Sequence, residues 1–148
     1  MQIPSSNLPS WDNNWGDTGA DGTLNPGGDN IKAAEAGYYK LNVDLVGLTY
    51  TAVKTTWGLI GSATPGGWDT DTPMTYDVVN KVWTCTVDLT GDKVKFRANG
   101  GWDLNYGDDG ANGSLEAGGA DIAVPAAGNY TVTLNLSNPV YKYKLQKN

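Results

Sequence analysis

The residues of this sequence that could do chemistry are aromatic, amide and cationic side chains in two glycine-rich loops and one strand. Trp68 stands in PGGWDTD, and Trp102 stands in NGGWDLNYG. Just before the second loop, alternation along KVKFRA predicts that Arg97 leaves the core and is exposed on the outer face of its strand. Indole faces can stack on the apolar face of a sugar ring, while Arg97, Asn99 and Asn105 can bond to hydroxyl groups. The pattern predicts a carbohydrate-binding platform.

Other aromatic residues are weaker candidates for this platform. Tyr106 follows Trp102 in the same stretch, so we expect it to be a further aromatic contact. Trp83 lies on the apolar face of VWTCTVDL and Trp57 opens a strand, and we expect both to be structural. The alternative role for Trp68 and Trp102 is to cap the ends of the fold.

The sequence does not favour an enzyme or a cofactor. It has no histidine, the commonest general base and metal ligand. Cys85 is the one cysteine; it faces inward and lacks the basic partner that a nucleophile needs. The carboxylate pairs that a glycosidase would use, Asp69 with Asp71 or Asp103 with Asp108, lie in turn-rich loops of a small module. We expect no catalysis and no cofactor.

Two acidic loops, GDTGADG and GDDGANG, offer oxygen atoms that calcium could use. The candidate ligands are Asp17, Asp21, Asp108, Asp109 and Asn112. A calcium-binding EF-hand loop needs a glutamate at its twelfth position, where Gly28 and Gly119 stand here. Because aspartate and glycine are also what tight turns need, we expect no metal site.

The charge pattern excludes some partners. The net charge is −6, whereas a nucleic-acid-binding face is basic, so we expect no nucleic-acid partner. No apolar run is long enough to span a bilayer.

Short segments that alternate apolar and polar residues predict strands, and glycine-rich turns separate them. The predicted strands are YYKLNVDL, LTYTAVK, WGLIGSA, VWTCTVDL, KVKFRA, NYTVTLNL and VYKYKLQ. No helix of any length is expected. The spacing predicts an all-β, antiparallel β-sandwich.

An internal repeat sets the expected domains. WDNNWGDTGADG at residues 11–22 recurs as WDLNYGDDGANG at 102–113, and roughly 17 of 44 aligned positions are identical over the whole repeat. Residues 57–99 have no counterpart before the first copy. We therefore expect residues 1–54 to be the back half of a truncated module and residues 55–148 to be a complete one. The first copy keeps Trp11 and Trp15 but lacks equivalents of the GGWD loop and the KFR strand.

A half-sandwich leaves an apolar face and open strand edges. The face of Tyr39, Leu41, Val43 and Leu45 needs cover. The half module is expected to pack on the complete one, to pair with a second copy, or to be poorly ordered. Of these we favour pairing, which makes a homodimer.

The motifs IGSATPGGWD, VKFRAN and WDLNYG, within residues 57–148, resemble the tandem starch-binding modules of the SusE and SusF outer-membrane lipoproteins of Bacteroidetes. The resemblance implies a non-catalytic, immunoglobulin-like carbohydrate-binding module. It implies a lipid-anchored parent at the bacterial cell surface that captures starch or maltooligosaccharide for an outer-membrane glycan transporter. It also implies a site of two aromatic residues and one basic residue. Trp68 and Arg97 match most directly, Trp102 is the second aromatic, and Tyr106 and Asn105 match less well.

A spacer or assembly domain without sugar binding is the alternative function. Trp68 separates the two hypotheses, because a spacer would keep this side chain packed. The sequence leaves open the particular glycan, the oligomeric state and the origin of the truncated start.

Overall fold

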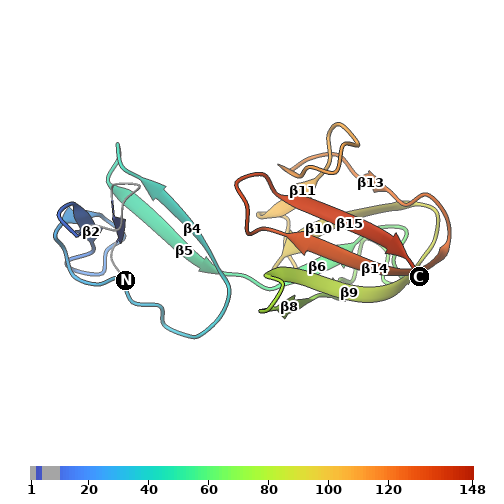
Figure 1. Ribbon diagram of the computed structural model, residues 1–148, viewed down its shortest axis with the longest axis horizontal. Coiled ribbons are helices and arrows are strands. Elements are labelled where there is room, and N and C mark those ends of the chain that lie inside the picture. Colours follow the sequence, from blue (N-terminus) through green and yellow to red (C-terminus); the bar gives the residue numbers. More distant parts are fainter. Residues whose placement is uncertain (1–2, 5–10) are drawn as a thin grey trace. The chain divides into compact units, whose positions relative to one another are not determined.

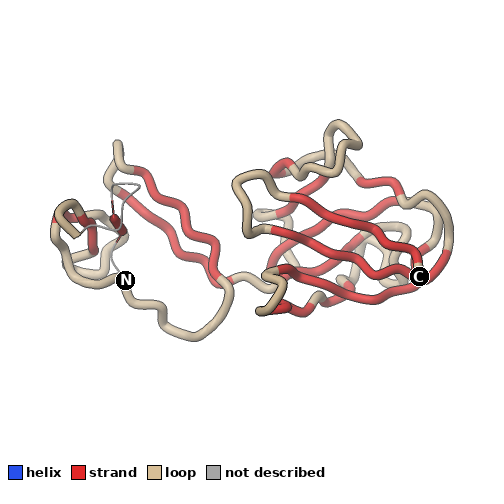
Figure 2. The backbone as a smooth tube through the Cα atoms, viewed as in Figure 1, coloured by secondary structure: helices blue, strands red, loops and turns tan. Residues whose placement is uncertain are grey.

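The computed structural model describes residues 11–148 and the backbone of residues 3–4. The described chain is all-β, with antiparallel strands and no helix, as predicted (Figure 2). Without a helix, these residues contain no helical membrane span. The chain divides into two compact units, Met1–Thr55 (unit 1) and Thr56–Asn148 (unit 2).

Unit 2 contains two sheets that pack in a sandwich-like arrangement. In Figure 1, β9 (Val82–Leu89), β14 (Gly128–Asn135) and β15 (Lys142–Lys147) cross in front of β6 (Trp57–Ile60) and β10 (Lys93–Ala98). One sheet has the order β12 (Glu116–Ala117), β11 (Asn105–Gly107), β10 (Lys93–Ala98), β6 (Trp57–Ile60), β7 (Thr72–Pro73), and β13 (Ile122–Ala123) also pairs with β10. The other has the order β15 (Lys142–Lys147), β14 (Gly128–Asn135), β9 (Val82–Leu89), β8 (Thr75–Asp77).

Alternation decides which side chains of unit 2 fill its core. Phe96 on β10 and Val132 and Leu134 on β14 are fully buried. The Phe96 ring lies 5.9 Å from the ring of Tyr143 on β15, so side chains of the two sheets meet. Trp57 and Trp83 are also buried, which confirms that they are structural; nearly all of the predicted strand positions are strands as well.

Unit 1 contains two small sheets. One has the order β1 (Ile3–Pro4), β2 (Asn14–Gly16), β3 (Asn25–Pro26), and the other is a hairpin of β4 (Tyr39–Asp44) and β5 (Thr49–Lys54).

The hydrogen bonds show that the sequence repeat is also a structural repeat. The hydroxyl of Tyr39 donates to the carbonyl of Glu35 at 2.8 Å, and the hydroxyl of Tyr130 donates to the carbonyl of Ala126 at 2.7 Å. Strands β2, β3, β4 and β5 therefore correspond to β11, β12, β14 and β15. The turn before β15 is two residues longer, because Asp44 pairs with Thr49 whereas Asn135 pairs with Lys142.

Strand β1 corrects one expectation about the first copy. Its Pro4 pairs with Asn14, as Arg97 of β10 pairs with the equivalent Asn105. The first copy thus has a counterpart of the KFR strand in its backbone, contrary to the prediction, but proline stands where the arginine stands in unit 2. The GGWD loop has no counterpart in the described residues of unit 1.

Candidate functional site

Two partly exposed tryptophans lie side by side on unit 2. Trp68 exposes 38% of its surface and Trp102 exposes 47%. Their ring centroids are 6.1 Å apart and their planes are tilted by 40°. The loops that carry them follow β6 and β10, which are adjacent strands of one sheet. The structure thus brings together the two aromatic residues that head the predicted platform.

Glycines shape the loop that presents Trp68. A Cβ atom on Gly66 would lie 2.2 Å from the carbonyl oxygen of Thr70, so no other residue fits there. Gly67 has a φ of 58°, in the left-handed region that favours glycine. The Thr64 hydroxyl donates to the carbonyl of Gly61 at 2.9 Å and ties the loop to the end of β6. The tight backbone leaves the next side chain, Trp68, partly in solvent.

The predicted asparagines shape the loop of Trp102. Asn99 has a φ of 55°, and its side-chain oxygen accepts from the backbone N–H of Thr56 at 2.9 Å. The side-chain Nδ2 of Asn105 donates to the carbonyl of Trp102 at 2.7 Å, and its Oδ1 is buried. Asn99 is exposed, whereas Asn105 is half-buried and holds the loop of Trp102, and its contact with a ligand stays a prediction.

Arg97 lies on the outer face of β10, but the expectation that it is exposed is wrong. It is only 7% exposed, and its Nε donates to Asp71 Oδ1 at 2.7 Å. Its Cζ lies 4.8 Å from the centroid of the Trp102 ring, a cation–π contact. The side chain is covered because the loops of both tryptophans fold over it. Arg97 therefore supports the platform from below.

Gly58 makes room for this ion pair. It is the strand partner of Arg97 on β6. A Cβ atom on Gly58 would lie 2.8 Å from the Cβ of Asp71, so a larger residue would displace the carboxylate.

Tyr106 belongs to the core, so its prediction as an aromatic contact is wrong. It is 3% exposed and stacks on Trp57, with ring centroids 5.4 Å apart and planes at 25°. The edge of Tyr141 packs against it at 5.2 Å. The reason is that Tyr106 lies on β11 opposite Phe96, whose side chain also faces inward.

Three polar residues near the two tryptophans were not predicted as ligand contacts. Lys95 is half-buried, with Nζ 5.9 Å from the centroid of Trp102. Asp69 and Asp103 are exposed directly after the two tryptophans. Two signals could have identified them: the dipeptide Trp-Asp recurs in both loops, and Lys95 shares a strand face with Arg97.

The acidic loops hold the repeat together. Asp108 accepts from the backbone N–H groups of Gly113 at 2.8 Å and Asn112 at 3.1 Å, and from the hydroxyl of Tyr143 at 2.9 Å. Burial raises the pKa of Asp108, but these donors outweigh it and the net pKa is lowered. Asp17 of unit 1 accepts from the hydroxyl of Tyr50 at 2.7 Å. Both aspartates thus tie an acidic loop to the last strand of their unit.

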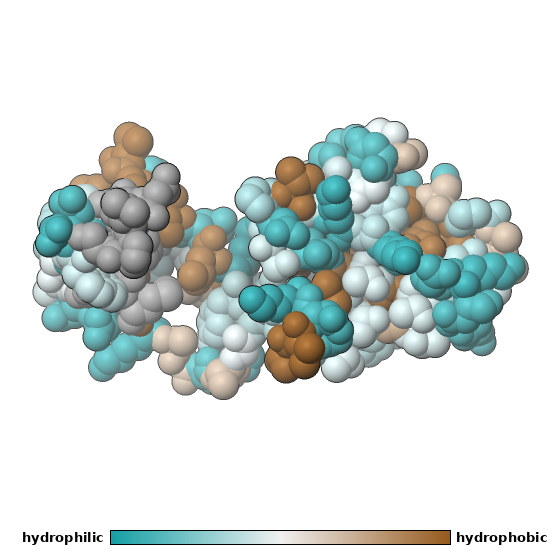
Figure 3. All heavy atoms as spheres, in the orientation of Figure 1, coloured by the Kyte–Doolittle hydropathy of each residue, from teal (hydrophilic) through white to brown (hydrophobic). Residues whose placement is uncertain are grey.

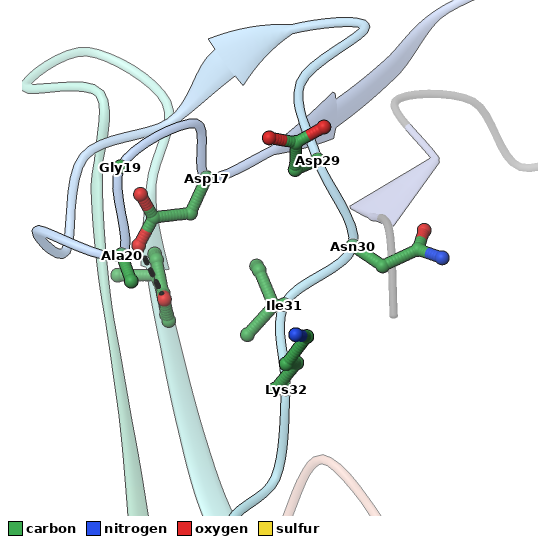
Figure 4. A pocket seen from close by; sticks show the side chains of 8 residues that line it. Asp17, Gly19, Ala20, Asp29, Asn30, Ile31 and Lys32 are labelled. Atoms are coloured by element: carbon green, nitrogen blue, oxygen red, sulfur yellow. Dashed lines mark hydrogen bonds between the residues drawn. The ribbon is translucent and has the colours of Figure 1, made fainter.

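A pocket of about 250 Å³ opens beside Asp17 in unit 1 (Figure 4). Ile31 and Tyr50 line it. Their equivalents in unit 2 are covered by β10, because Ile122 pairs with Val94 and the ring of Tyr143 packs on Phe96. The pocket therefore lies where β10 covers the equivalent residues of unit 2. We place the candidate site at the tryptophans of unit 2, since an open platform forms no cavity.

No protein-family model and no curated protein matches the chain. The fold and the site define the class: a β-sandwich that presents two tilted tryptophans over a partly buried ion pair.

Proposed function

We propose that unit 2 is a non-catalytic carbohydrate-binding module that captures a polysaccharide, with starch or another α-glucan as its ligand. The observation that carries this proposal is the pair Trp68 and Trp102, partly exposed, 6.1 Å apart and tilted by 40°. A linear, flat glycan fits coplanar aromatic rings, whereas an α-glucan curves. Two tilted rings can each stack on a sugar of a curved chain.

Polar groups around the rings suit the hydroxyl groups of a sugar. Lys95 can donate hydrogen bonds, and the carboxylates of Asp69 and Asp103 can accept them. The platform is open and has few strong contacts, so the affinity of one module is modest. Tandem copies in a parent protein would raise avidity through effective concentration.

The wider setting is proposed from the resemblance to SusE and SusF. The parent protein would be lipid-anchored at the outer membrane, on the bacterial cell surface, and would pass glycan to an outer-membrane transporter. Release of reducing ends from starch is not expected, because the proposed role is capture.

Native gel electrophoresis with and without amylopectin tests the proposal. We expect amylopectin to retard the wild-type chain and not Trp68→Ala. Trp11→Ala is the matched control, because Trp11 is the repeat counterpart of Trp102, is 66% exposed and stands in unit 1. Retardation of this control should equal that of the wild type.

The other outcomes are equally informative. If amylopectin fails to retard the wild type, the α-glucan assignment fails, and a panel of other polysaccharides decides between another glycan and a spacer. If Trp68→Ala is retarded like the wild type, the site lies elsewhere.

A further inference from the structure

The hairpin of unit 1 carries an apolar face that is half exposed. Leu41, Val43 and Leu45 expose 46%, 42% and 48% of their surfaces. Figure 3 shows brown, apolar atoms at the tip of this hairpin. The equivalents of Leu41 and Val43 in unit 2, Val132 and Leu134, are fully buried. The same sheet face is therefore closed in one unit and open in the other.

Among the described residues, no strand pairs with the outer edge of β4. In unit 2, the equivalent strand β14 lies between β15 and β9. In the described part of unit 1, β4 belongs to a two-stranded sheet with β5 alone. A flat edge of alternating apolar residues readily pairs with another strand.

We propose that the β4 edge pairs antiparallel with β4 of a second copy of this chain, with a two-fold axis at Asn42. In an antiparallel pair, residues directly opposite each other point to the same face. A symmetric pairing must therefore place one residue opposite itself. The choice of register reduces to the choice of that residue.

Charge selects Asn42. With the axis there, Lys40 lies opposite Asp44 of the second copy, and this pair occurs twice. An axis at Lys40 would oppose two lysines, and an axis at Asp44 would oppose two aspartates, both unfavourable. With the axis at residue 41 or 43, neither Lys40 nor Asp44 would face an opposite charge on the second copy.

The same register also matches the apolar face. Leu41 lies opposite Val43 of the second copy, and this apolar pair also occurs twice. The side chain of Asp44, which would face Lys40 of the second copy, is fixed by the turn. Its Oδ1 accepts from the N–H groups of Val46 and Gly47 at 2.9 Å each. Pairing spans only residues 40–44 of each strand. One short strand buries less surface than the roughly 800 Å² per partner that is typical of a stable complex, so the dimer is weak and depends on concentration.

Sedimentation equilibrium of the full chain tests the proposal. We expect the mass to rise from 15.7 kDa towards twice that value with concentration. Lys40→Glu places like charges opposite each other twice and should weaken association roughly tenfold. Lys144→Glu is the matched control, because it makes the same charge change on an exposed position of β15, and it should associate like the wild type.

A mixture provides the decisive test. Lys40→Glu and Asp44→Lys should each associate poorly alone, whereas their mixture restores both opposite-charge pairs and should form a heterodimer. If Asp44→Lys fails to fold because its turn loses an acceptor, the double variant Lys40→Glu with Asp44→Asn keeps that oxygen and should recover part of the association.

Two results would overturn the proposal. One is a monomer at all concentrations; the other is association that Lys40→Glu leaves unchanged. If the wild type stays monomeric but its β4 amides become protected when a polypeptide of residues 56–98 is added, the edge takes a strand like β9 instead. Starch binding by unit 2 is independent of all these outcomes.

Discussion

Arg97 should act on a bound glycan through Trp102. The guanidinium is nearly buried, holds Asp71 and lies 4.8 Å from the centroid of the Trp102 ring. The decisive perturbation is a double-mutant cycle of Trp102→Ala and Arg97→Met. If Arg97 only supports the indole, its removal costs no further affinity once the indole is gone.

The magnitudes follow from the exposed surface. Trp102 exposes 47% of its surface, which is about 120 Å² for a side chain of about 250 Å². If a sugar covers half of that area, Trp102→Ala costs about 1.5 kcal/mol, or roughly tenfold in Kd. The cation–π contact is part of this arrangement, so Arg97→Met should cost about 0.5–1 kcal/mol, roughly threefold. The double variant should stay near tenfold.

Isothermal titration with a maltooligosaccharide measures each corner of this cycle. Asp71→Asn belongs in the series, because it loosens the guanidinium without touching a sugar, and it should weaken binding about as much as Arg97→Met does. A double variant weakened roughly thirtyfold would mean additive effects and a direct sugar contact by Arg97. That result would refute the supporting role.

Three further predictions concern folding and reactivity. Gly107→Ala should lower the free energy of unfolding by about 1–3 kcal/mol, because its Cβ would lie 2.1 Å from a backbone carbonyl oxygen. Gly101→Ala is the control: its Cβ would meet nothing within 4 Å, so chemical denaturation should show a stability near that of the wild type. Burial and then the hydrogen bond to Asp108 raise the pKa of Tyr143 to about 12, so the folded state favours the protonated hydroxyl. The stability that this provides is complete below about pH 10 and is lost as pH rises towards 12; alkaline denaturation should show this loss, and Tyr143→Phe should remove it. Burial raises the pKa of the Cys85 thiol to about 11, so iodoacetamide should alkylate the folded chain at pH 8 far more slowly than the unfolded chain.

The strands were predictable because most of the long strands alternate apolar and polar residues. Val94 and Phe96 point into the core and Arg97 points away from it, as the period of two requires. The short strands were not predicted. Glycine and asparagine make WDLNYG resemble a loop, although Asn105–Gly107 is strand β11. That error placed Tyr106 at the surface.

The burial of Arg97 could not be predicted from its strand. Alternation gives the face of the sheet on which a side chain stands, but burial depends on what covers that face. Here the cover comes from Asp71 and Trp102, in two loops distant in sequence. Their convergence depends on β6 and β10 being neighbours, which the pattern of single strands does not contain.

The repeat separates residues that both copies share from residues that only one copy carries. The residues shared by both copies form the scaffold: Asp17 and Asp108 each bind a tyrosine of the last strand. Gly16 and Gly107 each lie too close to a backbone carbonyl oxygen to carry a Cβ. Retention of these residues preserves the loop and leaves the binding chemistry undetermined.

The residues that distinguish a platform lie outside the shared scaffold. Trp11 repeats Trp102, yet Pro4 stands where Arg97 supports the indole, and the described part of unit 1 has no loop like that of Trp68. Among the described residues of unit 1, Trp11 has no equivalent of Trp68 or Arg97, so that part of the unit does not repeat the geometry proposed for a curved glycan. The proposed sugar site therefore depends on strands β6 and β10 together with the loops that follow them, and we place the proposed binding on unit 2.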